Sequence, residues 1–399
     1  MPQVKPDIET FAKIKVVGVG GSGGSAVSRM IAEKIKGVDF IAMNTDVQAL
    51  HRNPAPQKLH IGKSVTRGLG AGMDPDVGRK AAEESQNEIR DLLKDADMVF
   101  ITCGLGGGTG SGGGPVVAAV AKEIGALTVA VVTKPFSFEG PQRRDIAEKA
   151  WENLARNVDA IITIPNEKVL QIVDKKTSVL EAFKTADDIL RQGVQGIAEL
   201  ITIPGEINVD FADVKAIMRD AGSALMGIGL GTGENRAAEA AKAAISSPLL
   251  EVSIDGARGI LLNITGGPDL TMSEVNEAAR IITSSAADDA KIIFGFNVNE
   301  AMTGSVSISV IATGFDDRRP PAIPVENETN QFFSANKFSA NNFLRKQQKE
   351  DDEEEKRFKQ QMVHQQPRPE TIKTSQPVEQ KNEDDDLEIP AFIRKKMGI

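Results

Sequence analysis

The sequence predicts an α/β protein in which helices cover both faces of a parallel sheet. Three observations predict this fold. Short apolar runs that suit buried strands alternate with segments of helical periodicity. From Ser178 to Thr202, apolar residues recur at three- and four-residue spacing, which indicates one long central helix. A second, smaller α/β unit follows that helix, and after Phe315 the composition turns strongly polar.

The first unit takes its strands from four apolar runs: Lys13–Gly18, Phe40–Met43, Met98–Thr102 and Leu127–Val132. Helical patterns lie between them, for example Val77–Leu93. Pro115, followed by an apolar run, predicts the start of another helix, because proline is well tolerated in a first helical turn.

The central helix carries one apolar stripe, made of Val179, Phe183, Ala186, Leu190, Val194 and Ile197. The second unit is expected to contain the strands Gly259–Ile264, Lys291–Phe294 and Ser305–Ile311. Its helices are expected at Val214–Arg219, Arg236–Ile245 and Ser273–Thr283.

These patterns divide the chain into six parts: an N-terminal extension (1–12), a first domain (13–177), the central helix (178–202), a second domain (203–315) that begins with a loop (203–213), a disordered linker (316–386) and a terminal peptide (387–399). Residues 316–386 cannot bury enough apolar surface to fold. The apolar and basic peptide beyond them is typical of a docking motif on a tether; a frayed terminus is the alternative.

Composition excludes several classes of protein. A net charge of −9 argues against general nucleic-acid binding, and the lack of tyrosine argues against stacking on single-stranded bases. One cysteine, Cys103, excludes an internal disulfide framework, and three scattered histidines do not suit a histidine-rich metal site. No stretch has the apolar length that a membrane span needs, so we expect a cytosolic protein without direct membrane insertion.

The segment Gly104–Gly114 is the strongest local signal. Eight of its eleven residues are glycine, and it lies between an apolar strand and a predicted helix. Glycine lets successive backbone N–H groups converge, and a helix N-terminus adds positive potential. The segment therefore predicts a phosphate-binding loop rather than a flexible linker.

A second glycine segment, Gly18–Gly24, directly follows the first strand and contains G-x-G-x-x-G. With Asp39 as the ribose-binding acid, it would suit a dinucleotide-dependent oxidoreductase. Two phosphate loops on adjacent strands fit that alternative less well, because a dinucleotide needs only one. A Walker loop is excluded, because Gln57 stands where its first glycine should be.

Several separated motifs occur in one order: Asn44–Asp46, Thr66–Gly72, Gly106–Gly112, Lys134–Gly140, Ile164–Asn166 and Asn208–Asp213. On these motifs the chain resembles the tubulin/FtsZ family of GTPases, from about Ile14 to Gly314 and again over the last dozen residues. The resemblance implies a tubulin-like fold and a GTP-hydrolysing, self-assembling protein of the bacterial division ring. It implies GTP or GDP with Mg²⁺ as ligands, and a non-catalytic tubulin homologue that acts as a scaffold is the alternative.

The resemblance also assigns residues to the nucleotide. Phosphate contacts fall to Gly21, Ser22, Gly23, Gly24 and Ser25, to Gly107, Gly108, Thr109, Gly110 and Ser111, and, near the terminal phosphate, to Gly70, Ala71 and Gly72. Asn44 and Asp46 would hold the sugar-phosphate side, with Asp46 reaching Mg²⁺ through water, and Glu139 and Arg143 would contact the ribose.

Asn166, Phe183 and Asp187 are the residues implied to choose the base. Phe183 would stack on the purine, while Asp187 would accept hydrogen bonds from the N1–H and amino groups of guanine. Adenine has an acceptor at N1, so it would leave the carboxylate unpaired. The sequence leaves open whether Phe183 is instead an ordinary core residue, because it lies on the apolar stripe of the helix.

Hydrolysis is assigned by the resemblance to Asp210 and Asp213, supported by Asn208. They would act in trans, in the nucleotide pocket of the next subunit, and orient the attacking water. Without the resemblance, Asp213 would be taken as a helix cap. Head-to-tail contacts of this kind propagate as an open filament.

The terminal peptide resembles the family's docking motif for membrane-tethering cell-division adaptors. The residues implied in that contact are Ile389, Pro390, Phe392, Ile393 and Arg394. The protein is accordingly expected in the cytoplasm, at the division site at midcell.

Overall fold

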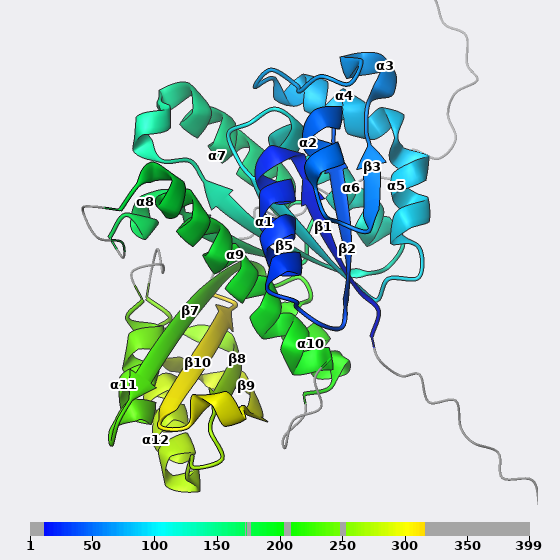
Figure 1. Ribbon diagram of the computed structural model, residues 1–399. Helices are drawn as coiled ribbons and strands as arrows, with labels where there is room; N and C mark the ends of the chain where they lie inside the picture. The colour runs from blue at the N-terminus through cyan, green and yellow to red at the C-terminus, as the bar shows by residue number, and fades with distance from the viewer. Residues whose placement is uncertain (1–11, 172, 174–176, 203–208, 248–252, 316–399) are drawn as a thin grey trace, which may run out of the picture. The chain divides into compact units, whose positions relative to one another are not determined.

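The computed structural model describes residues 12–171, 173, 177–202, 209–247 and 253–315 (Figure 1). Within these residues the strands are β1 (Ile14–Val19), β2 (Val38–Asn44), β3 (Gln57–His60), β4 (Met98–Gly104), β5 (Leu127–Lys134), β6 (Ala160–Pro165), β7 (Gly222–Thr232), β8 (Ala257–Gly266), β9 (Ala286–Val298) and β10 (Ser305–Thr313). They form one sheet in the order β3-β2-β1-β4-β5-β6-β7-β10-β8-β9.

The helices of the same residues are α1 (Gly20–Ala32), α2 (Val47–Arg52), α3 (Lys63–Thr66), α4 (Pro75–Glu84), α5 (Gln86–Leu93), α6 (Thr109–Glu123), α7 (Pro141–Ala155), α8 (Asn166–Val169), α9 (Val179–Thr202), α10 (Phe211–Met218), α11 (Arg236–Ile245) and α12 (Met272–Thr283). Two short 3₁₀ turns, Ser137–Glu139 and Glu300–Met302, complete the set.

All pairs among strands β1 to β7 are parallel, as is the pair β8–β9, and β10 runs antiparallel to both β7 and β8. The pairing between β6 and β7 is short, since only Ala160–Ile162 pair with Gly222–Ala224. The predicted strands all appear, and β3, β6 and β7 are additional to them. The sheet is thus continuous from the first predicted domain into the second, and the division at residues 177 and 203 stays a prediction.

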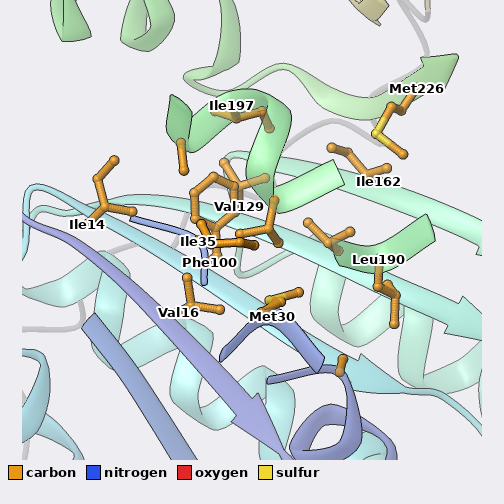
Figure 2. Close-up of a cluster of buried hydrophobic side chains, with 14 of the residues drawn as sticks. Ile14, Val16, Met30, Ile35, Phe100, Val129, Ile162, Leu190, Ile197 and Met226 are labelled. Carbon is orange, nitrogen blue, oxygen red and sulfur yellow. The ribbon is translucent and has the colours of Figure 1, made fainter. Parts of the chain in front are cut away.

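Residues on the inner strands alternate between two apolar layers, as expected for a parallel sheet covered on both faces. Val16, Phe100 and Val129 belong to the core on the side of α1 and α9, which includes Met30, Leu190 and Ile197 (Figure 2). Val17, Ile101 and Ala130 belong to the opposite core, which α4 to α7 cover. A third core joins α11 and α12 to β8 and β10.

The central helix α9 confirms the prediction from periodicity. Ala186, Leu190, Val194 and Ile197 of the predicted stripe are buried. The helix begins after Ser178, whose hydroxyl accepts from the Glu181 N–H at 3.3 Å while Glu181 accepts from the Ser178 N–H at 2.9 Å. These reciprocal bonds satisfy donors at the first turn.

Two predicted helix boundaries are wrong. The helix expected over Val77–Leu93 is two helices, α4 and α5, which meet at Ser85. The helix expected to start at Pro115 starts at Thr109, so Pro115 lies inside α6. The physical reason is packing: α6 lies directly against α4, and a Cβ on Gly112 would be only 1.9 Å from the Pro75 carbonyl oxygen. Close contact with α4 thus favours a helical glycine segment despite its low intrinsic propensity.

Candidate functional site

The two glycine segments follow adjacent strands. Strand β1 pairs with β4, while β2 lies on the other side of β1, so the order of the sheet reverses between β1 and β4. In open α/β sheets, ligands bind outside the carboxyl ends of the strands at such a switch point. Asp39 pairs with Lys15 near the opposite, amino end of these strands. It therefore cannot serve as the ribose-binding acid of a dinucleotide site.

Three loops meet at this end of the sheet. Gly20, with φ of +76°, lies so close to the start of α6 that an added Cβ would be 2.9 Å from the Gly110 nitrogen. A Cβ on Gly108 would be 2.8 Å from the Ala71 Cβ and 2.9 Å from the Asp74 nitrogen. Backbones approach this closely only where side chains are absent. The loops after β1 and β4 and the loop at residues 70–74 therefore form one surface.

The segment after β2 is hydrogen-bonded to the same loops. The Thr45 and Thr109 hydroxyls lie 2.8 Å apart, and the Val47 N–H donates to the Gly68 carbonyl at 3.2 Å. Asp46 caps α2, accepting from the N–H groups of Gln48 at 2.8 Å and Ala49 at 3.1 Å through one carboxylate oxygen. Asn44 accepts from the Asp46 N–H at 3.2 Å. Asn44 and Asp46 thus lie beside the glycine loops.

A cavity of about 700 Å³ extends from the glycine loops to the first turns of α9. Eight of the residues predicted to bind the nucleotide line it: Ser22, Ser25, Gly107, Glu139, Arg143, Asn166, Phe183 and Asp187. A second cavity of about 290 Å³ is lined by Gly21, Gly24 and Asn44 and shares Ser25 with the first. Residues far apart in the sequence therefore line the same cavity.

The far end of the large cavity carries polar groups that suit a base. Asn166 is 6% exposed, and its Oδ1 is buried without a hydrogen-bond partner. Burial raises the pKa of Asp187 to about 6, partly offset by the nearby Arg29 cation. Phe183 is 40% exposed and lies edge-on to Phe136, with ring centroids 5.2 Å apart. Phe183 is therefore not a core residue but presents part of its ring to the cavity.

Two family models match separate parts of the chain. Residues 13–174 match the family model for the GTPase domain of the Tubulin/FtsZ family, and residues 222–316 match that for the FtsZ family C-terminal domain. The empty FtsZ dimer of M. jannaschii is 48% identical, with a TM-score of 0.75, over 78% of this chain and 90% of that one. The chain belongs to the tubulin/FtsZ family.

Two further structures agree in fold. A mutant FtsZ of M. jannaschii is 49% identical, covers 76% of this chain and 92% of its own, and gives a TM-score of 0.74. The GTPγS-bound protofilament of CetZ2 from Haloferax volcanii is 23% identical, with a TM-score of 0.65, over 77% of this chain and 95% of that one. Membership makes the protein a cytoskeletal GTPase of the self-assembling kind, and neither a scaffold without catalysis nor an oxidoreductase is favoured.

Glu139 and Arg143 form an ion pair at the rim of the large cavity. The second carboxylate oxygen of Glu139 accepts from the Phe136 N–H at 2.9 Å. The turn that carries both Phe136 and Glu139 thus forms one side of the cavity. The carboxylate and the guanidinium at this rim are therefore fixed relative to each other.

The remaining predicted residues of the glycine loops line neither of these two cavities. Thr109 and Ser111 are buried, and the Ser111 hydroxyl accepts from the Gly106 N–H at 2.9 Å. Ser111 therefore uses its side chain to shape the loop, which leaves its backbone N–H as the group for an anion. Gly23 packs on β4, where a Cβ would be 2.3 Å from the Thr102 carbonyl oxygen. Gly70 and Gly72 face open space.

The prediction missed several wall residues, of which Arg29 is the most informative. Arg29 lines the large cavity, and its Nε is buried without a hydrogen-bond partner. Its spacing was a usable signal: Ser22, Ser25 and Arg29 recur at three and four residues, so they share one face of α1. Thr133, Pro135 and Leu180 were also missed, while Gly104 and Leu105 belong to the predicted phosphate-binding loop without having been named as contacts.

The predicted catalytic acids lie away from both cavities. Asp210 caps α10 by accepting from the Ala212 N–H at 3.2 Å, so the cap expected at Asp213 is at Asp210 instead. Asp213 lies in the first turn of α10. Asn208 and the terminal-peptide residues, Ile389 to Arg394, lie outside the described residues. Among the helices that are described, none has both the length and the hydropathy to cross a membrane.

Proposed function

We propose that the protein binds GTP in the large cavity, hydrolyses it at contacts between successive subunits and so forms filaments of the bacterial division ring. One observation carries the proposal. A single cavity has glycine loops at one end and, at the other, the unpartnered Asn166 carbonyl beside Asp187 and the exposed Phe183 ring. Anion-binding backbone and purine-binding side chains are thus separated along one pocket.

Guanine fits the polar end better than adenine. The Asp187 carboxylate accepts hydrogen bonds, and guanine offers two donors side by side at N1 and the exocyclic amine. Adenine would turn an acceptor toward it, and a buried polar group left unpaired costs about 1–3 kcal/mol. That amount is about 5- to 150-fold in affinity, which is enough for GTP to be preferred to ATP.

The phosphates would be held by backbone N–H groups at the starts of α1 and α6. The first turn of a helix has N–H groups without partners inside the helix, and both helices start within glycine loops. Asp46 has a carboxylate beside these loops and would hold Mg²⁺ through water. The ion would neutralise phosphate charge that builds up when the terminal phosphoryl group is transferred to water.

The acids would come from the next subunit, because they are remote from the cavity of their own chain. Phe183 lines the cavity and Leu200 is 17 residues further along α9, which at ~1.5 Å per residue is a span of about 26 Å. Val209 remains at that distant end: an added Cβ on Gly295 would lie 2.4 Å from Leu200 and 3.3 Å from Val209. Asp210 follows Val209 directly, so only another copy brings it to a nucleotide.

A site shared by two subunits supports a head-to-tail filament whose contacts weaken when the terminal phosphate is lost. The empty FtsZ dimer of M. jannaschii shows self-association in a relative that is 48% identical. We extend the proposal to the terminal peptide, with Ile389, Pro390, Phe392, Ile393 and Arg394 binding membrane-tethering adaptors. The filament would then lie in the cytoplasm at midcell.

Light scattering of the full chain with Mg²⁺ tests the proposal. GTP is expected to produce a rise that decays as phosphate is released, while GDP and ATP produce none. A flat trace with GTP at high protein concentration, together with no release of phosphate, would reject both assembly and hydrolysis.

Asp210 is tested with two substitutions that separate its chemistry from its cap. Asp210→Asn keeps an N-capping side chain for α10 but lacks the carboxylate, and Asp210→Ala lacks both. Both variants are expected to bind GTP with unchanged affinity and to lose at least about tenfold in hydrolysis rate. Normal turnover by the asparagine variant would reject the catalytic role of the carboxylate.

A further inference from the structure

Two threonine hydroxyls face each other directly beneath the phosphate loops. Thr45, between β2 and α2, is wholly buried, and Thr109, the first residue of α6, is 8% exposed. Their oxygens are 2.8 Å apart, and either can be the donor. Thr109 lies between the two cavities: Gly107 lines the large one, and Gly20, which lines the second, would place an added Cβ 3.4 Å from the Thr109 Cβ.

The chemistry of a hydroxyl pair distinguishes its two arrangements. Each hydroxyl has one hydrogen to donate. If Thr109 donates to Thr45, its hydrogen is used up and it offers a ligand only lone pairs. If Thr45 donates to Thr109, the Thr109 hydrogen is available. A phosphate oxygen is an acceptor, so the Thr109 hydroxyl can donate to a phosphate at the start of α6 only in the second arrangement.

Thr45 is itself held on both sides. Before it, Asn44 accepts from the Asp46 N–H at 3.2 Å, and after it the Val47 N–H donates to Gly68 at 3.2 Å. Turning the backbone at Thr45 would therefore disturb the local Asn44–Asp46 bond and the bond from Val47 to a neighbouring loop.

We propose that Thr45 is a positioning residue of the phosphate site. Its hydroxyl donates to Thr109 and so directs the Thr109 hydrogen toward a nucleotide phosphate, although Thr45 does not touch the nucleotide. The inference rests on the proposed function, because it needs a phosphate at the start of α6.

The test measures the affinity of the full chain for GDP and GTP by competition with a fluorescent GDP analogue. Thr45→Val is nearly isosteric and removes only the hydroxyl. It is expected to weaken both nucleotides about 5- to 10-fold, since one hydrogen bond to a charged group is no longer well directed. Thr45→Ser keeps the hydroxyl and is expected to bind within about twofold of the unaltered chain.

A double-mutant cycle separates positioning from a general loosening of the loop. If Thr45 acts through the Thr109 hydroxyl, Thr45→Val has no further effect on affinity in a chain that already carries Thr109→Val. A merely structural role would weaken binding in both backgrounds. Thr128→Val is the matched control, because it removes another fully buried threonine hydroxyl, bonded to the Ala126 carbonyl at 3.1 Å, near the start of β5. It is expected to leave affinity unchanged.

Three results would overturn the inference: no loss of affinity in Thr45→Val, an equal loss in the Thr109→Val background, or no rescue by serine. Thermal melting shows whether each variant folds. If Thr45→Val does not fold, Thr45→Ala takes its place in the cycle. Failure of the unaltered chain to bind guanine nucleotides is a different result, which would overturn the proposed function and this inference with it.

Discussion

Asp187 is the residue whose charge the proposed guanine site depends on. Burial raises its pKa to about 6, so it is half protonated near that pH in the empty site. Only the carboxylate accepts from both guanine donors. The affinity for GDP is therefore expected to be level above about pH 7 and to fall about tenfold between pH 7 and pH 5.

Competition binding between pH 5 and pH 8 checks this expectation. Asp187→Asn does not titrate, so its affinity should be low and independent of pH over the same range. A parallel fall in that variant would assign the titration to another group.

Glu274 is the second residue with a pH-dependent role, here in stability. Hydrogen bonds from Arg236, whose side chain is 7% exposed, hold the pKa of Glu274 at about 2. A carboxyl whose pKa is lowered by folding stabilises the folded state above its unfolded pKa and loses that contribution as pH falls. The free energy of unfolding is thus expected to decrease from about pH 4.5 towards pH 2.

Urea unfolding at several acidic pH values measures that dependence. Glu274→Gln should flatten it, whereas Glu277→Gln, the same change on an exposed position of α12, should not. Equal curves for all three chains would show that the Arg236 contact does not contribute.

The positions and contacts of individual side chains were the least predictable from the sequence. Phe183 lines a cavity and Leu190 is a core residue, but both lie on the apolar stripe of α9 at helical spacing. The periodicity alone therefore could not distinguish them. The pairing of Thr45 with Thr109 joins residues 64 positions apart, and no local pattern indicates it. Asn166 and Asp187 were named from the family resemblance and not from spacing, and both line the large cavity.

At the scale of elements, β7 and α11 form an unusually close contact. Added Cβ atoms on Gly227, Gly229 and Gly231 would lie 1.9–2.0 Å from carbonyl oxygens of α11. Backbone atoms cannot give way as a side chain does. Gly229→Ala is therefore expected to lower the free energy of unfolding by about 3 kcal/mol, at the upper end of ordinary overpacking.

Denaturation followed by circular dichroism tests this contact. The matched control is Gly196→Ala in α9, where the nearest atom to an added Cβ is 3.8 Å away, in ordinary contact. Because alanine suits a helix better than glycine, that variant should gain up to about 1 kcal/mol. A similar loss in both variants would contradict the argument from close packing.

Elements with a clear apolar period were predictable, and the glycine segments were not. Glycine has low helix propensity, so Gly110–Gly114 were expected to form a loop, yet they lie in α6. Contact with α4 stabilises their helical conformation, and that contact cannot be inferred from the local sequence. The pairing of β6 with β7 is likewise a long-range event, so the single sheet could not be foreseen from strand patterns.

For the whole molecule, the distance between the acids and the cavity makes a mixing experiment decisive. Asp210→Asn has an intact pocket, and Asp187→Ala has an intact acid but a damaged pocket. Mixed filaments would place the acid of the second chain over the nucleotide of the first. Phosphate release from the mixture is expected to exceed the sum of the separate rates at the same protein concentrations.

Colorimetric phosphate measurement over a range of mixing ratios, with the largest gain near equal amounts, would support the shared site. A mixture no faster than its components would count against it. The same arrangement predicts that the rate per chain of the unaltered protein falls steeply on dilution, because a solitary chain has no acid at its pocket.

The separation between Asp210 and the cavity of its own chain also fixes a simple count. In the proposed filament, n subunits have n pockets but only n − 1 junctions, so one terminal pocket would lack its acid. The nucleotide there would outlast every other nucleotide in the filament and remain open to exchange with solution. The two ends of the filament would consequently differ in chemistry as well as in direction, even though every subunit is identical.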